Sequence, residues 1–483
     1  MCVHEIPFIT WHRPYLVLYE QTLGRLIQNI SLQYTGDDAV SYRSAAQDFR
    51  IPYWDWAVDS HLPPSTTWPE ITISTPTGKE RMANPLYSFS WPDYPLNHES
   101  DWFPTSDDPI FWNFTGSQRQ LDDDGTLLQL NTSALTDKYS VLSKTKDFDS
   151  MASTNNRGPS LEDPHNDIHV NTGRFMQNPV YSAFDPLFWL HHANVDRFFA
   201  LWQAINHNTT YQTQPANITS GTFTQAKNTW MTADSPLTPF YQGDGQDMHT
   251  GRSIASIKTF GYTYPEINDW SMSPEHTRQL VIRQVNQMYG PYKIEIKPGR
   301  TTAIPYRHLQ RQRRERDALN AERQYYVQIG VDRSELDLPC TIKVMLGPDI
   351  LAGTVNIMAM PAIGRTNSEI QLNRAIKQLT QCVEDKTVVP LLESKFRLEI
   401  RKFDGAVIPL ETVPSLAADV QSVDVQIPET DDELPDYGAF ITSYPKIGRP
   451  SHGYAPSGKG ENTSSRLSYF RKTWNEILEM IRW

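Results

Sequence analysis

The spacing of apolar side chains predicts a helical first part of the chain. Residues 1 to about 30 carry Leu, Tyr and Ile at steps of three to four, which indicates a helix. Asp185 followed by Pro186 is typical of another helix start, with a side-chain cap and then a proline at the first helical position. Pro164 marks a further helix start just upstream. We therefore expect a mainly helical core over residues 1–270.

Beyond residue 323 the apolar period changes to two. The alternating positions are Tyr325, Val327, Ile329 and Val331, then Cys340, Ile342, Val344 and Leu346, then Phe396, Leu398 and Ile400, and later Val423, Val425 and Ile427. Asp404 and Gly405 give a tight-turn signal after the third of these runs. Several short strands with turn signals predict a β-sandwich over residues 324–449.

In the remaining stretches, apolar residues show little periodic spacing or lie outside the two predicted domains. Residues 60–160 are rich in Pro, Ser, Thr, Asp and Trp, and we expect long surface loops there. Residues 271–323 include a highly charged run from 307 to 323, which indicates a linker rather than a binding patch. Residues 450–483 place Leu, Phe, Trp and Ile on one helical face, as in an amphipathic helix packed on its own protein.

Composition narrows the classes of protein. A length of 483 residues favours two or three domains, and a net charge of −12 has the wrong sign for nucleic-acid binding. The chain contains no run of eighteen apolar residues, so we predict no membrane span. The first residues lack the charged start and apolar run of a signal peptide, so a cytoplasmic location is favoured while the compartment stays open. Three cysteines are too few for a disulfide framework, and the oligomeric state is unknown.

The histidines of this chain are candidate metal ligands. His165 and His169 are four residues apart, hence on one helical face, and His191 and His192 follow on the next helix. Three imidazoles from two helices can converge on one metal, and imidazole suits zinc, copper, iron and nickel alike. A second histidine block, from residue 2 to residue 20, also lies among aromatic residues. Two blocks predict two metals in one four-helix cluster.

Longer motifs resemble a known family. The run Asp185-Pro-Leu-Phe-Trp-Leu-His-His192-Ala-Asn-Val-Asp196 resembles the copper B signature of the type-3 dicopper proteins, and most closely that of the fungal tyrosinases. Trp11-His12-Arg13-Pro14-Tyr15 is similar to their copper A helix, and residues 260–267 to the segment that closes their core. The resemblance implies an α+β multidomain fold, in which a mainly α-helical four-helix-bundle core with long loops holds two copper ions and a C-terminal β-sandwich follows.

The resemblance also implies roles for single residues. The implied ligands are His165, His169 and His192 for copper B, and His4 and His12 for copper A. His191 is expected to be structural or to support a ligand. Cys2 and His4 match a motif in which the cysteine sulfur is bonded to the copper-A histidine ring as a thioether.

Glu162 and Asn166 resemble the pair that, in tyrosinases, holds a water able to accept the phenol proton. A phenol has a pKa near 10, so a positioned base lets it bind copper as phenolate. The alternative is that Glu162 only favours the dipole at the start of its helix and that Asn166 is ordinary polar surface.

The function that the resemblance implies is copper-dependent oxidation of phenols by O2. It comprises o-hydroxylation of monophenols and oxidation of o-diphenols to o-quinones, in a melanin, pigment or secondary-metabolite pathway. The partners are a small phenolic substrate and O2. One alternative is oxidation of catechols or o-aminophenols only, and another is oxygen carriage, since haemocyanins share the dicopper site.

A further alternative is an inactive remnant. The family's first copper-A histidine lies upstream of its Cys-x-His motif, whereas this chain starts one residue before Cys2, which leaves copper A with two of its three histidines. We therefore expect either a core that is incomplete at its N-terminus or a protein with an impaired copper A. Cys340 and Cys382 are also too far apart to form the Cys-x-x-Cys motif that some fungal tyrosinases use for copper delivery.

Overall fold

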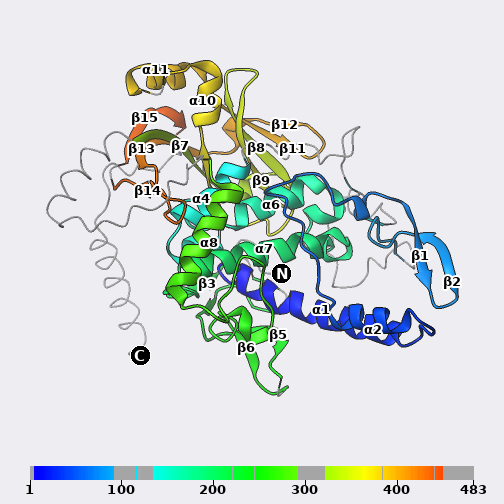
Figure 1. The fold of residues 1–483 in the computed structure, drawn as a ribbon. Coiled ribbons are helices and arrows are strands. Elements are labelled where there is room, and N and C mark those ends of the chain that lie inside the picture. The colour runs from blue at the N-terminus through cyan, green and yellow to red at the C-terminus, as the bar shows by residue number, and fades with distance from the viewer. Residues whose placement is uncertain are drawn as a thin grey trace, which may run out of the picture.

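A helical core and a β-sandwich make up the computed structural model of this chain (Figure 1). The structure describes residues 5–91, 116–117, 119, 134–291 and 321–449, apart from positions 220, 223, 244, 383 and 440. The predicted fold class, helices first and a C-terminal sandwich after them, is confirmed.

Helix α7 is the centre of the helical core. The main helices are α1 (Phe8–Ser31), α4 (Ala134–Lys144), α6 (Glu162–Thr172), α7 (Leu187–Ile205) and α8 (Pro274–Tyr289). α7 is buried along almost its whole length, because it is apolar on most of its faces and the other helices surround it. Asp185 caps it as predicted: its carboxylate accepts a hydrogen bond of 2.9 Å from the backbone N–H of Leu187.

Short elements surround this core. They are α2 (Ala39–Gln47), α5 (Phe148–Ala152), the hairpin of β1 (Glu70–Thr75) and β2 (Gly78–Ala83), the pair β3 (Ala216–Ile218) and β4 (Thr229–Met231), the pair β5 (Pro236–Tyr241) and β6 (Met248–Thr250), and the single 3₁₀ turns η1 (Pro64–Thr66), η2 (Arg174–Gln177), η3 (Ser182–Phe184) and η4 (Ile257–Phe260). The prediction of loops throughout residues 60–160 was therefore wrong in part. Nearly all side chains of β1 and β2 are exposed, so only the short alternation of Ile71 and Ile73 marks this hairpin in the sequence.

The sandwich consists of two antiparallel sheets. One has the order β10-β7-β13-β14, with β15 also paired to β13, and the other has the order β12-β11-β8-β9. The strands are β7 (Ala321–Asp332), β8 (Cys340–Leu346), β9 (Leu351–Ile357), β10 (Arg365–Gln371), β11 (Phe396–Lys402), β12 (Val407–Ile408), β13 (Ala417–Gln426), β14 (Asp436–Tyr437) and β15 (Thr442–Arg449), joined by α10 (Asn373–Leu379), α11 (Asp385–Lys395), η5 (Arg333–Glu335) and η6 (Leu410–Thr412). β8 alternates as predicted, whereas β7 is buried on both faces because it also faces the helical core.

Polar contacts join the sandwich to the core. The amide of Asn356 in β9 donates to the carboxylate of Asp167 in α6 at 2.7 Å. The ammonium group of Lys144, at the end of α4, binds both carboxylate oxygens of Glu369 in β10 at 2.5 and 2.7 Å. The sandwich therefore lies directly against α6, one of the two helices that carry clustered histidines (Figure 1).

The predicted linker of residues 271–323 begins too early. α8 occupies Pro274–Tyr289, and its apolar face places Val281, Ile282 and Val285 in the helical core. Ser273 caps this helix, with its hydroxyl accepting from the backbone N–H of His276. The sequence did not predict α8, because the region is highly charged and only one face of this helix is apolar. Residues 292–320, with most of the predicted linker, and the predicted tail helix at 450–483 lie outside the described residues.

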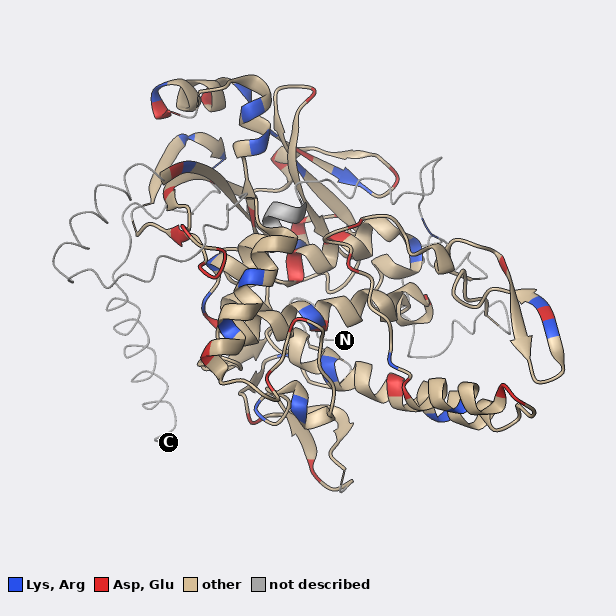
Figure 2. Cartoon of the chain, in the orientation of Figure 1, with Lys and Arg blue, Asp and Glu red and all other residues tan. Residues whose placement is uncertain are grey.

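Charges are dispersed over the described elements. Figure 2 shows Lys and Arg interspersed with Asp and Glu, rather than separated onto different elements. Within the described part of the chain, no helix has both the length and the apolar content to cross a membrane.

Candidate metal centre

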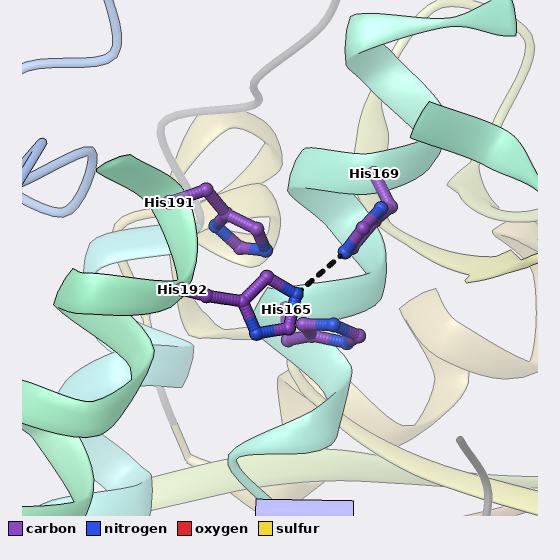
Figure 3. Close-up of side chains that lie close together, drawn as sticks. All are labelled: His165, His169, His191 and His192. Carbon is purple, nitrogen blue, oxygen red and sulfur yellow. Dashed lines mark hydrogen bonds between the residues drawn. The ribbon is translucent and has the colours of Figure 1, made fainter. Parts of the chain in front are cut away.

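Two helices bring four histidines together. His165 and His169 come from α6, and His191 and His192 from α7, with each side chain at most 1% exposed. Figure 3 shows the four rings converging between the two helices. One nitrogen of each lies within 4.8 Å of one from every other member. The predicted convergence of imidazoles from two helices is therefore present in the structure.

The closest approach is between His169 and His192. Their Nε2 atoms are 3.1 Å apart, and a dashed line marks this contact in Figure 3. Nitrogens bound tetrahedrally to one ion at about 2.0–2.1 Å would lie about 3.3 Å apart. The pair is thus spaced like two ligands of one ion.

Neighbouring acceptors orient the histidine rings. Nδ1 of His165 donates to the amide oxygen of Asn166 at 3.0 Å, and Nδ1 of His169 donates to the backbone carbonyl of Met176 at 2.6 Å. Nδ1 of His12 donates to the carbonyl of Phe8 at 2.7 Å. Each donation leaves a lone pair on Nε2, the arrangement that metal-binding histidines need.

The residues fit a metal ion. Nε2 of His12 and of His165 are buried and have no hydrogen-bond partner among the described residues. Burial lowers the pKa of His12 to about 3 and that of His169 to about 4, and it holds the pKa of His165 well below its usual range. These imidazoles are therefore neutral near pH 7, which is the form that binds metal.

His191 lies closer to the cluster than predicted. Its ring stacks on that of His165, with centroids 5.2 Å apart, and neither ring nitrogen has a partner among the described residues. A histidine with a purely structural role would be expected to satisfy at least one buried nitrogen. The structure thus places His191 beside the predicted copper B ligands, whereas its role as ligand or support stays a prediction.

The N-terminal block reaches the same site through α1. The ring of His12 stacks on that of His192, with centroids 4.4 Å apart. Next to it, Nε of Arg13 binds the carboxylate of Asp196 in α7 at 2.6 Å, and both side chains are buried. Cys2 and His4 lie outside the described residues, so their thioether and the second ligand of copper A stay predictions.

The described hydrogen bonds of Glu162 all use one carboxylate oxygen, Oε2. Its carboxylate accepts hydrogen bonds from the backbone N–H and the hydroxyl of Thr154, at 2.9 and 3.0 Å, and from the hydroxyl of Ser153 at 3.3 Å. Glu162 thereby fastens the start of α6 to the segment before it. Asn166 orients His165, as described above. The predicted water held between Glu162 and Asn166 stays a prediction.

Two residues beside the site were given no role in the sequence analysis. The ring of Phe188, one turn before His192, stacks on it with centroids 4.0 Å apart. Met358, which follows β9, is 1% exposed and packs on Val170, the neighbour of His169. Helical spacing could have indicated Phe188, because it precedes His192 by four residues. No signal pointed to Met358, since its contact joins segments far apart in the chain.

Two family models match the chain. The common central domain of tyrosinase matches residues 2–205, and the tyrosinase C-terminal domain matches residues 324–420. The tyrosinase of Podospora anserina is 35% identical over 314 residues, covering 60% of this chain and 54% of that protein. The tyrosinase of Neurospora crassa is 36% identical over 323 residues, covering 60% and 45%. The chain thus spans about half the length of these curated relatives.

Solved structures share the fold. A recombinant mushroom tyrosinase has a TM-score of 0.74 at 22% identity, covering 92% of this chain and 85% of that one. An Aspergillus oryzae pro-tyrosinase variant has a TM-score of 0.62 at 19% identity, covering 91% and 82%. The two family models, which together match more than half of the chain, and the curated fungal relatives show that the chain belongs to the tyrosinase family, whose type-3 centre takes two copper ions.

Proposed function

We propose that this chain oxidises phenols with O2 at a copper centre built on α1, α6 and α7. The observation that carries the proposal is the buried cluster of neutral imidazoles, in which Nε2 of His12, His165 and His191 has no described hydrogen-bond partner. When bound, copper supplies the electrons that let dioxygen react with a phenol, and neutral imidazole suits both Cu(I) and Cu(II). His165, His169 and His192 would hold one ion, and His12 would contribute to the other.

The chain's own residues shape the place where a phenol would bind. Phe188 stacks on His192 and holds its ring in place. Asn166 fixes the ring of His165, and the carbonyl of Met176 fixes that of His169. These contacts hold the imidazoles in one orientation through a reaction cycle.

The finer proposal is that both reactions occur, o-hydroxylation of monophenols and oxidation of o-diphenols to o-quinones, in pigment or secondary metabolism. A monophenol needs a base for its proton more than a catechol does, because the catechol loses its proton more easily. Glu162 and Asn166 remain the residues proposed to provide that base through a water. An enzyme that lacks this step would oxidise catechols or o-aminophenols only.

Burial of the cluster favours a second candidate function, which is O2 binding without phenol turnover. The four clustered histidines are at most 1% exposed, and Met358 of the sandwich covers Val170 beside them. Dioxygen can reach a site that is closed to a phenol. The second candidate therefore predicts reversible O2 binding and no product.

Copper content and turnover of a simple catechol, measured on the same sample of full chain, test the proposal. Copper retained by the chain together with quinone formation would support it. The second candidate would be supported if the chain retains copper and binds O2 reversibly but forms no quinone, even after the sandwich is displaced. Absence of bound copper after reconstitution would contradict both.

A further inference from the structure

A cavity of about 450 Å³ lies outside the histidine cluster, on another side of the core. Helices α1 and α7 form two of its walls, and the segments 50–53 and 261–270 form the others. None of the clustered histidines lines it. Its aromatic lining residues are Tyr53, Tyr262, Tyr264 and Trp270. A volume of this size, lined by aromatic and aliphatic side chains together with the charged groups of Glu20, Arg50 and Asp196, is within the range of small-molecule sites.

Two of the aromatic rings are held in place from behind. The hydroxyls of Tyr262 and Tyr264 both donate to the carboxylate of Asp196, at 2.5 and 2.7 Å. Arg13 holds that carboxylate in turn at 2.6 Å. The two rings meet edge to face, with centroids 5.7 Å apart and planes at 89°. Because these rings are already ordered, a ligand would lose little free energy in ordering them.

The lining carries charges of both signs, and two of its aromatic rings already face a cation. The guanidinium of Arg197 lies 4.7 Å from the ring centre of Tyr53, and the ammonium of Lys258 lies 5.1 Å from that of Trp270. A cation on a ring weakens the attraction of that ring for another cation and strengthens its attraction for an electron-rich ring. Two of the four aromatic residues are therefore better suited to stacking with a neutral aromatic molecule.

One carboxylate oxygen can orient such a molecule. Oε2 of Glu20 accepts a hydrogen bond from the backbone N–H of Ile51 at 2.9 Å. Its Oε1 forms an ion pair with Nε of Arg50 at 3.9 Å, a distance too long for a hydrogen bond. This oxygen is placed to accept a hydrogen bond from an N–H or O–H group in the cavity.

We propose that this cavity binds a neutral, electron-rich, planar aromatic molecule that carries an N–H or O–H donor. The site is separate from the histidine cluster and does not depend on copper. Its recognition elements are the fixed tyrosine rings, the face of Trp270 and the carboxylate of Glu20.

Indole is a suitable probe because it has an electron-rich ring and an N–H donor but no phenol hydroxyl. Calorimetric titration of the full chain should show one indole site. Trp270→Ala should weaken indole binding at least tenfold, because Trp270 supplies a stacking face and, at 56% exposure, is not needed for folding. Trp230→Ala is the matched control: Trp230 is 64% exposed and lies outside the cavity, so its loss should leave binding unchanged.

A second variant and two other ligands also test the proposal. Val17→Trp should fill the cavity from α1 and also weaken indole binding at least tenfold. Cyclohexanol, which has a donor but no aromatic ring, and tetramethylammonium, which is a cation, should both bind at least tenfold more weakly than indole. Unchanged indole binding in both Trp270→Ala and Val17→Trp would overturn the proposal. So would the absence of indole binding up to the solubility limit of indole, or tighter binding of tetramethylammonium than of indole.

Discussion

Neighbouring residues orient three of the four clustered histidines, each by its own contacts. Asn166 holds His165, and the carbonyl of Met176 holds His169. His192 has no such acceptor at Nδ1 among the described residues, and stacking on His12 and Phe188 positions its ring instead. Loss of any one imidazole should therefore affect metal binding more than folding.

The first prediction concerns His165, His169 and His192. Replacing any of them by Ala should lower the copper content of the purified chain, because each removes one of three predicted copper B ligands. The far-ultraviolet circular dichroism should stay close to that of the unmodified chain. His191→Ala is the informative comparison, since retained copper would assign His191 a supporting role. Unchanged copper in all three ligand variants would contradict the site assignment.

The second prediction separates the two roles considered for Glu162. If it helps a base accept the phenol proton, Glu162→Gln should reduce turnover of a monophenol about tenfold or more while affecting a catechol less. If it only fastens the start of α6 through Ser153 and Thr154, both substrates should lose activity equally and the chain should unfold at lower temperature. Initial rates on tyramine and catechol, with thermal unfolding of the same samples, distinguish these outcomes.

The sequence indicated most of the site because its signals are local. His165 and His169 share a helical face by spacing, and the run around His192 is a long motif. The partners of Glu162 were missed because Ser153 and Thr154 lie in a stretch without periodicity. The packing of Met358 on Val170 joins two folded parts, which spacing along the chain does not reveal.

At the scale of elements, a buried ion pair joins the helices that carry His12 and His192. Arg13 in α1 and Asp196 in α7 are both buried, and the guanidinium also donates to the side chain of Gln203 at 2.9 Å. The fold of this region was predictable from apolar spacing and helix-start signals. α8 was not, because a helix with one apolar face in a charged region resembles a linker.

The third prediction tests this ion pair. Asp196→Asn should lower the free energy of unfolding by about 3–5 kcal/mol, because it leaves a buried guanidinium without its counter-charge. Denaturant unfolding measures the change. Asp234→Asn is the matched control, since Asp234 binds Arg252 at 2.7 Å on the surface and its loss should change stability little. Equal effects of the two substitutions would show that the buried pair does not stabilise the core.

At the scale of the whole molecule, the sandwich and the core are joined mainly by polar contacts. Asn356 binds Asp167, and the backbone N–H of Ala359 donates to the carbonyl of Gln177 at 3.0 Å. Both contacts lie on or next to α6 and η2, beside His169. Removing the sandwich would therefore expose the side of the cluster that faces β9.

The fourth prediction concerns the joint between the two parts. The run of residues 307–323 is rich in arginine, and we predict that limited trypsin digestion cuts there and releases a core fragment. All but the last three of these residues lie outside the described part of the chain. Mass spectrometry of the fragments locates the cuts. Cuts mainly elsewhere would show that the linker is misplaced.

The last prediction asks whether the sandwich closes the site to phenols. Met358 is 1% exposed and packs on Val170, so Met358→Ala should open space beside His169 and raise catechol turnover severalfold. Copper per chain should stay the same, because no predicted ligand changes. Met360→Ala is the matched control: it removes the same side chain from the same segment, but Met360 is 38% exposed, so turnover should not rise. A rise in both variants would indicate general loosening of the segment. No rise in Met358→Ala, combined with a rise after tryptic removal of the sandwich, would mean that other contacts of the sandwich close the site. No rise after either change would show that the sandwich does not limit the access of phenols to the site.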